Sequence, residues 1–366
     1  MKYLRNEKDI SGCAIAGIMS ETGRRFPGEM ITESIACMRE RSSGLGGGFA
    51  AYGIYPENQN DYAFHVMFEH PAAQRLLLDY LAQNCIIIKE EPIPTEPIAA
   101  ISSPPILRRY FLKPKPEPLR LRKGATDDDM MAIMALHINR RIDGAFVLSS
   151  GKNMGIFKGV GYPEDIARFF RLNEYEGYIW LAHGRFPTNT TGWWGGAHPF
   201  GLLDWALVHN GEISSYGINK RYLENFDYHC SLHTDTEVIT YLFDLLVRKQ
   251  SLPLELACRV LAPPFWSTIE MMDPESRGMA KTIRIVYGGA LLNGPFSVAV
   301  GHAGGMIGLN DRTKLRPMIA ARSRDLLFIA SEESAIRKIC ARPDSLWHVE
   351  GGEPVIGEVR KQCVSG

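Results

Sequence analysis

A cysteine that precedes an apolar run near the start of the chain limits most strongly how this sequence can fold. A leader of twelve residues, 1–12, ends in Ser-Gly, and Cys13 is followed by Ala14–Met19, small and apolar residues typical of a buried strand. In most proteins such a cysteine is a core residue. Cleavage before Cys13 would free its α-amine, which could then act as the general base for the thiol of the same residue.

The composition excludes several classes of protein. Hydrophobic residues make up 45% and charged residues 22% of the 366 residues, as in ordinary globular proteins. Lysine plus arginine equals aspartate plus glutamate, 41 each, which argues against nucleic acid or a membrane surface as the main partner. The leader lacks the apolar segment of a secretory signal, and we expect no transmembrane helix.

The seven cysteines are scattered and form no C-x-x-C pair. This spacing speaks against a disulfide framework, a zinc ribbon and an iron–sulfur cluster. The spacing of the histidines offers no credible metal site either. We therefore expect a reduced, cytoplasmic protein that holds neither a metal ion nor a cofactor in this chain.

The chain divides into a main unit, residues 13–60 and 151–366, and an insertion, residues 61–150. The main unit has many apolar strands with helices before and after them, which predicts an α/β (α+β) sandwich whose sheets pack face to face. The insertion repeats the order strand, helix, strand twice, which is typical of a ferredoxin-like βαβ-βαβ subdomain. Eight prolines in 91–118 predict an extended surface connector between its halves.

Three loops that follow apolar segments carry candidate binding residues. Arg185 comes directly after a buried strand and could grip a carboxylate through two parallel hydrogen bonds, although a structural salt bridge is the commoner role of a lone arginine. Asn210-Gly211 is above all a turn signal; the alternative is an oxyanion hole formed by the Asn210 amide and the Gly211 N–H. Asp235 either caps a helix, as Thr236 could, or holds an ammonium group.

Together these groups suit the hydrolysis of a side-chain amide on a free amino acid, and at this point the sequence resembles a known family. Its motifs occur in the order seen in class II glutamine amidotransferases, which are N-terminal-nucleophile (Ntn) hydrolases. The resemblance is to the amidotransferase domain of glutamate synthase, in the form found as a separate subunit. The motifs are 13–17, 183–190, 197–200, 209–213 and 234–237, with later agreement at 293–296, 314–317 and 330–335.

The resemblance implies a four-layer αββα Ntn-hydrolase sandwich and assigns the chemistry to three residues. Cys13 would attack the side-chain carbonyl of L-glutamine to form a γ-glutamyl thioester, and its freed α-amine would carry the proton. Asn210 and Gly211 would stabilise the tetrahedral oxyanion. The products would be glutamate and ammonia.

The resemblance also implies how the substrate is held. Arg185 would bind the α-carboxylate of glutamine, with Thr188 at the same site. Asp235 would bind the α-amino group. A different Ntn hydrolase, acting on another amide, remains an alternative, but a cation and an anion together favour a free α-amino acid.

Two departures from the family pattern matter. Cys13 is not at position 2, so the leader 1–12 must be removed before the α-amine is free. We expect this cleavage to begin with attack of Cys13 on the Gly12 carbonyl. No β/α barrel and no cysteine cluster follow in the sequence. We therefore expect FMN and an iron–sulfur cluster on partner subunits. The insertion 61–150 is a candidate docking surface for these subunits. Two other functions remain as alternatives to a glutamate synthase subunit. They are the amidotransferase subunit of an N-methylglutamate synthase and a catalytically silent glutamine-binding subunit.

Overall fold

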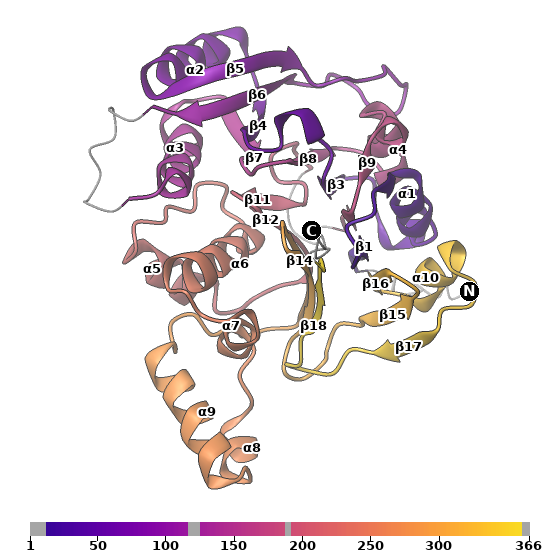
Figure 1. Cartoon of the computed structure of the whole chain (residues 1–366), viewed down its shortest axis with the longest axis vertical. Coiled ribbons are helices and arrows are strands. Elements are labelled where there is room, and N and C mark those ends of the chain that lie inside the picture. Colours follow the sequence, from indigo (N-terminus) through magenta and orange to yellow (C-terminus); the bar gives the residue numbers. More distant parts are fainter. Residues whose placement is uncertain (1–11, 116–124, 187–191, 361–366) are drawn as a thin grey trace, which may run out of the picture.

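The computed structural model describes residues 12–115, 125–186 and 192–360. Its centre is an antiparallel sheet of seven strands, shown in Figure 1. In order across the sheet they are β17 (Ser345–His348), β15 (Ile319–Ser323), β16 (Leu326–Ala330), β1 (Ala14–Ser20), β10 (Ile179–Gly184), β3 (Gly47–Tyr52) and β8 (Met154–Gly159). The strand predicted after Cys13 is thus the middle strand, and all seven of its residues are buried.

A second antiparallel sheet of five strands packs against the first. In order they are β11 (Phe200–Leu202), β12 (Trp205–Gly211), β13 (Phe296–His302), β14 (Gly305–Asn310) and β18 (Val355–Glu358). The sheets approach closely at Gly17, where an added Cβ would lie 2.7 Å from Sδ of Met306. The small residues that follow Cys13 allow this approach.

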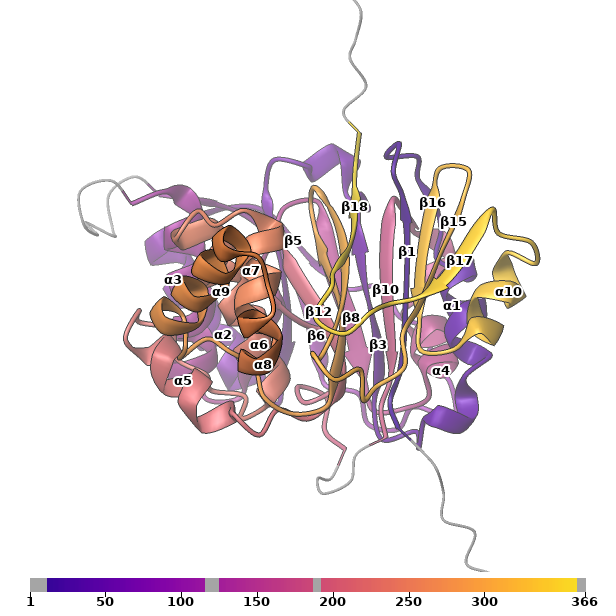
Figure 2. The same ribbon diagram turned by 90° about the horizontal axis from the view of Figure 1, so that it is seen from below.

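Helices cover the outer faces of both sheets, so the molecule has four layers (Figure 2). The seven-stranded sheet is covered by α1 (Glu29–Ala36), α4 (Pro163–Phe169) and α10 (Glu333–Ile339), and the other sheet by α5 (Tyr216–Glu224), α6 (Asp235–Phe243) and α7 (Leu254–Leu261), beyond which lie α8 (Trp266–Glu270) and α9 (Pro274–Val286). This arrangement confirms the predicted αββα sandwich.

Short elements complete the main unit. They are the strand pair β2 (Phe26–Pro27) and β9 (Glu176–Gly177), three 3₁₀ helices, η1 (Arg39–Arg41), η2 (Pro56–Asn58) and η3 (Leu172–Glu174), and a π-helix, η4 (Asp244–Lys249), which continues α6. Within the ranges that the structure describes, no helix is both long and apolar enough to cross a membrane.

The insertion forms a four-stranded antiparallel sheet whose order is that of a ferredoxin-like fold. Across the sheet the strands are β5 (Cys85–Pro92), β6 (Ile106–Pro114), β4 (Tyr62–Phe68) and β7 (Ala145–Ser149), with helices α2 (Pro71–Asn84) and α3 (Asp127–Arg141). Helix α3 begins with a capping box, in which the Thr126 hydroxyl accepts from the Asp129 N–H and the Asp129 carboxylate accepts from the Thr126 N–H.

The insertion shares its packing with the main unit. Leu77 of α2 and Met131 of α3 belong to the same apolar cluster as Leu242 of α6, whereas Phe111 of β6 belongs to the cluster around β1. Its sheet is therefore covered on both faces. The division of the chain into two units stays a prediction.

The proline-rich connector differs from its prediction in the part that the structure describes. Strand β5 continues to Pro92 and β6 ends at Pro114, so prolines that lack an N–H mark the strand ends. Between the two strands, Ile93 and Ile101 are buried in the core around β1. Most residues of 93–105 are exposed, as expected of a surface connector, although Ile93 and Ile101 anchor it to the core. The difference from the prediction is that Ile106–Pro114, within the expected connector 91–118, forms strand β6.

Candidate active site

Cys13 lies directly before β1, in a segment that three hydrogen bonds to distant residues hold in place. Its Sγ accepts a hydrogen bond from the Phe186 N–H at 3.3 Å, and its carbonyl oxygen accepts one from Nε of Arg41 at 3.4 Å. Two residues further on, the Ile15 N–H donates to the Ser331 hydroxyl at 3.1 Å. The thiol is therefore fixed at one end of the sandwich by residues far away in the sequence.

A cavity of about 400 Å³ opens beside this thiol. It brings together five of the six predicted site residues, Cys13, Arg185, Asn210, Gly211 and Asp235; Thr188 lies outside the described residues. The rest of the lining is Gly12, Phe186, Trp193, Gly196, His198, His209, Glu212, Ile213, Tyr216, Leu232, His233, Thr234 and Arg316.

Asn210 and Gly211 are the last two residues of β12, so the prediction of a turn at this Asn-Gly pair is wrong. The strand stays paired with β13 as far as Gly211, which adopts φ +138°. A Cβ on Gly211 would lie 2.0 Å from the Pro295 carbonyl oxygen, so this position needs glycine.

The amide of Asn210 has an unused donor. Its Nδ2 is buried and, among the described residues, has no hydrogen-bond partner. A buried N–H without a partner is costly, and its presence in a cavity is explained when a ligand oxygen completes the bond. This observation favours the oxyanion-hole role that the sequence left as the alternative.

Asp235 is the first residue of α6, whose N-cap is Thr234 and not Asp235 or Thr236. One carboxylate oxygen accepts from the Ile213 N–H at 3.1 Å, and the other lies 3.7 Å from Nδ1 of His209. Burial alone would raise the pKa of Asp235, but His209 and the backbone N–H donors outweigh it and lower the pKa. Asp235 is therefore an anion at neutral pH.

Arg185 supplies the opposite charge. Its N–H donates to the Gly46 carbonyl and its own carbonyl accepts from the Ser43 N–H, which holds the backbone after β10. Arg185 and Asp235 line the same cavity. One cation and one anion in a small cavity match the two charges of a free α-amino acid.

The thiol of Cys13 is protonated in this environment. Burial raises its pKa above the ordinary value, and the Phe186 N–H, Arg185 and Arg316 oppose this effect without overcoming it. A nucleophilic role therefore requires a base that takes the thiol proton.

Three histidines form a packed layer beneath the cavity. The rings of His183 and His198 stack with centroids 4.0 Å apart, His183 Nε2 lies 3.0 Å from the His209 carbonyl oxygen, and His198 Nε2 lies 3.2 Å from Oγ1 of Thr236. Burial lowers the pKa of His183 to about 3, so its ring is neutral. In the part of the chain that the structure describes, no three His, Cys, Asp or Glu side chains are arranged to hold a metal ion.

Sequence reasoning missed three groups near the thiol. The backbone N–H of Phe186 and the guanidiniums of Arg41 and Arg316 all lie around Cys13, and none was assigned a role. The motif 314–317 contained Arg316, but no local pattern indicated that a residue so distant in sequence reaches Cys13. Lys158 was also missed; it is buried, donates to the Gly195 carbonyl at 3.0 Å, and burial lowers its pKa to about 7.

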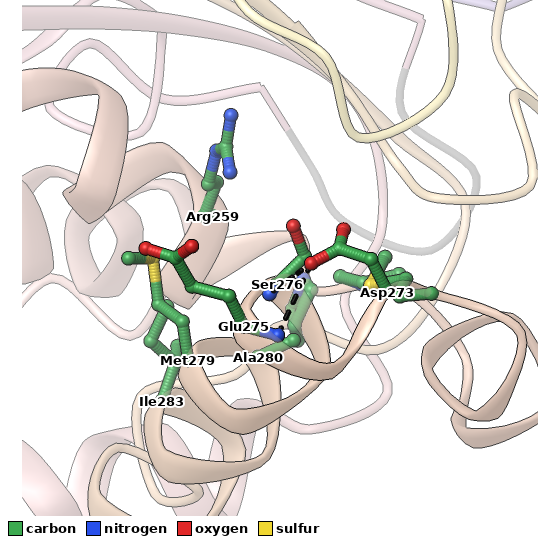
Figure 3. A pocket seen from close by; sticks show the side chains of 10 residues that line it. Arg259, Asp273, Glu275, Ser276, Met279, Ala280 and Ile283 are labelled. Carbon is green, nitrogen blue, oxygen red and sulfur yellow. Dashed lines mark hydrogen bonds between the residues drawn. The ribbon is translucent and has the colours of Figure 1, made fainter.

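A second cavity, of about 360 Å³, lies where α7 and α9 meet (Figure 3). It is lined by neither cysteine nor histidine, and its Asp273 caps α9 by accepting hydrogen bonds from the N–H groups of Glu275 and Ser276. It therefore offers no nucleophile and no base comparable to those around Cys13.

Comparisons with known proteins agree with this geometry. The family described as class-II glutamine amidotransferases matches residues 99–234, a range that contains Arg185, Asn210 and Gly211. An uncharacterized protein of Archaeoglobus fulgidus is 50% identical over 359 residues, which cover 97% of this chain and 94% of that protein.

More distant relatives carry functional names. A Methanothermobacter thermautotrophicus protein, provisionally named a glutamine amidotransferase, is 25% identical over 89% of this chain and 93% of its own length. The glutamine amidotransferase-like protein GlxB of Rhizobium meliloti is 27% identical over 52% of this chain and 54% of its own length. Among solved structures, the glutamine phosphoribosylpyrophosphate amidotransferase of B. subtilis is 16% identical, with a TM-score of 0.47 over 94% of this chain and 47% of that one. By its residues 99–234, this chain is thus similar to the class II glutamine amidotransferases.

Proposed function

We propose that this protein hydrolyses the side-chain amide of L-glutamine and delivers the ammonia to a partner subunit. The observation that carries the proposal is the cavity itself, in which the Cys13 thiol, the unpaired Asn210 amide, a cation and an anion meet. The charges of Arg185 and Asp235 suit the α-carboxylate and the α-ammonium of the substrate. The thiol and the amide suit attack on a carbonyl and stabilisation of the oxyanion.

In the proposed reaction, Sγ of Cys13 attacks the side-chain carbonyl carbon of glutamine. The thiol proton passes to the α-amine of Cys13 and from there to the leaving nitrogen, which departs as ammonia. Asn210 and Gly211 donate to the oxyanion while the tetrahedral intermediate exists. Water then hydrolyses the thioester, which releases glutamate and regenerates the thiol.

This reaction requires that the bond between Gly12 and Cys13 has been broken. Before cleavage the nitrogen of Cys13 is an amide and cannot accept a proton. We propose that Cys13 attacks the Gly12 carbonyl, that the acyl group moves from nitrogen to sulfur, and that water hydrolyses the resulting thioester. Retention of residues 1–12 in purified protein would favour the alternative, a silent glutamine-binding subunit.

The proposed acceptor is a glutamate-synthase-like subunit that carries FMN and an iron–sulfur cluster. The support is the set of sequence motifs shared with the amidotransferase unit of glutamate synthase. An N-methylglutamate synthase subunit, which would use methylamine, is the alternative acceptor, because the acceptor would bind to another chain.

A mechanism-based label tests the proposed reaction. The glutamine analogue 6-diazo-5-oxo-L-norleucine should alkylate Cys13 alone, and peptide mass spectrometry after digestion will locate the adduct. Intact mass should show loss of residues 1–12, and ammonia release should be seen with glutamine but not with asparagine. Full-length protein that releases no ammonia and takes no label, even with its partner subunits present, would refute the proposal.

Removal of either charge from the cavity should weaken substrate binding. We expect Arg185→Gln and Asp235→Asn each to lower kcat/KM by about 10- to 100-fold, mainly through KM, because each loses a charge-assisted hydrogen bond to glutamine. Steady-state ammonia release will measure both constants. Glu57→Gln, the same kind of change as Asp235→Asn but at an exposed position, is the control and should leave KM unchanged.

A further inference from the structure

Two guanidinium groups flank the bond that joins Gly12 to Cys13. A Cβ added to Gly12 would lie 3.4 Å from Nη1 of Arg316 and 3.5 Å from Nη2 of Arg41. The next nearest atom is Oδ1 of Asn210 at 3.6 Å, so none of these three neighbours belongs to a carboxylate. Since Arg41 also donates to the carbonyl oxygen of Cys13, the pair lies beside the nitrogen that cleavage would free.

Both arginines are held in place by the fold. Arg41 ends η1 and forms an ion pair with Glu332 at 3.1 Å. Arg316 is presented by the turn after β14, where the Asp311 carboxylate accepts from the N–H groups of Thr313 at 2.8 Å and Leu315 at 3.0 Å. Within the described part of the chain, Nε of Arg316 is buried and has no hydrogen-bond partner.

The acidic groups around this nitrogen are paired or exposed to solvent. Glu332 lies against Arg41, Asp235 is engaged by the Ile213 N–H and lies near His209, and Glu212 is exposed to solvent. Arg185 adds a third positive charge to the cavity. The remaining titratable groups that line it are Cys13, His198, His209, Tyr216 and His233.

We propose that Arg41 and Arg316 keep the freed α-amine of Cys13 in its neutral, proton-accepting form. The inference rests on the proposed function, in which this amine takes the thiol proton. An ordinary α-amine has a pKa of about 7.7–8.0 and is mostly protonated at neutral pH, so it is a poor base there. A nearby cation disfavours the charged ammonium form, and the same cations favour the thiolate that appears as the proton moves.

The proton balance is simple. The thiol proton moves to the neutral amine while the bond between sulfur and the substrate carbon forms. The resulting ammonium then gives the proton to the departing nitrogen. Arg41 and Arg316 act as positioning residues, because they set the protonation state of the base without taking the proton. Arg316 should contribute more than Arg41, whose charge is partly offset by Glu332.

Nitrogen NMR can measure the amine directly. Protein with Cys13 at its N-terminus is labelled with [¹⁵N]cysteine, and its α-amine nitrogen resonates apart from the backbone amides. If the leader is retained, a chain that starts Met-Cys13 supplies the same N-terminus after removal of the methionine, as checked by intact mass. The wild-type amine should titrate below the ordinary range. In Arg316→Gln its pKa should rise by about one pH unit, and Arg316→Lys should stay close to the wild type.

In Arg316→Gln, the acid limb of the glutaminase pH profile should move to higher pH by the same amount as the amine pKa. The reason is that a larger fraction of the amine is protonated at any given pH in this variant. Lys314→Gln, on the same turn but paired with Glu350 outside the cavity, is the control and should change neither titration. Arg41→Gln is the second variant in case Arg316→Gln does not fold, as judged by circular dichroism.

An unchanged or lowered amine pKa in the folded arginine variants would overturn the inference, as would an equal shift in Lys314→Gln. Because the titration needs no glutamine, it separates this inference from the proposed function. A protein that releases no ammonia but has a depressed amine pKa would contradict only the proposed reaction.

Discussion

Replacement of Cys13 by alanine should reduce ammonia release from glutamine by at least about 10⁴-fold, because removal of a catalytic nucleophile leaves only the contribution of binding and of the oxyanion donors. The fold should survive, since Cys13 precedes β1 and its side chain faces the cavity. A coupled glutamate or ammonia assay measures the rate, and thermal unfolding checks the fold. If Cys13 also removes the leader, the same variant will retain residues 1–12 in its intact mass.

The control for this prediction is another thiol. Cys37 is an exposed, unpaired cysteine at the end of α1, and Cys37→Ala should leave both the activity and the processing unchanged. Cys13→Ser separates chemistry from packing, because its hydroxyl fills nearly the same space as the thiol but is a weaker nucleophile. Ammonia release by Cys13→Ala at more than about a hundredth of the wild-type rate would show that another group performs the attack.

The layered fold could be predicted because its signals are local. The apolar run after Cys13 predicted β1, which lies where the pattern placed it. The repeated strand–helix–strand order predicted the ferredoxin-like sheet. Such patterns depend on neighbouring residues only, so the local structure that they predict forms unless tertiary packing overrides it.

Packing did override the pattern at Asn210-Gly211. Asn-Gly favours a tight turn, but here the pair continues β12, because Gly211 takes φ +138° where the Pro295 carbonyl leaves no room for a side chain. The glycine is required by a neighbouring strand and not by a turn. A contact of this kind joins residues that are far apart in sequence, so no local rule could find it.

The same limit applies to the charges around the thiol. Arg185, Asp235 and Asn210 were proposed from motifs, and the structure places all three in the cavity with Cys13. Arg41 lay in no motif, and the motif 314–317 gave Arg316 no role, because each enters the site through the pairing and packing of strands and loops. Sequence motifs thus pointed to the groups that we propose hold the substrate, whereas the groups that we propose act on the base became visible only in three dimensions.

The second large effect is expected at Asn210. Asn210→Ala should lower kcat for glutamine hydrolysis by about 100- to 1000-fold with little change in KM, because the lost donor acts on charge that develops only in the transition state. The unpaired, buried Nδ2 is the physical basis of this expectation. Asn210→Asp, which keeps the shape but replaces the donor by an acceptor, should be at least as damaging. Steady-state kinetics with glutamine separates kcat from KM.

Ser297 offers a matched control for this prediction. It lies directly opposite Asn210 on β13, it is buried, and among the described residues its hydroxyl has no hydrogen-bond partner. Ser297→Ala therefore removes a polar group from the same layer without removing a donor aimed at the substrate, and kcat should stay within about twofold of the wild type. If Asn210→Ala raises KM and leaves kcat unchanged, then Asn210 binds the ground state and the oxyanion-hole assignment is wrong. If Ser297→Ala lowers kcat as much as Asn210→Ala does, the loss reflects disturbance of the strand pair and not the missing amide.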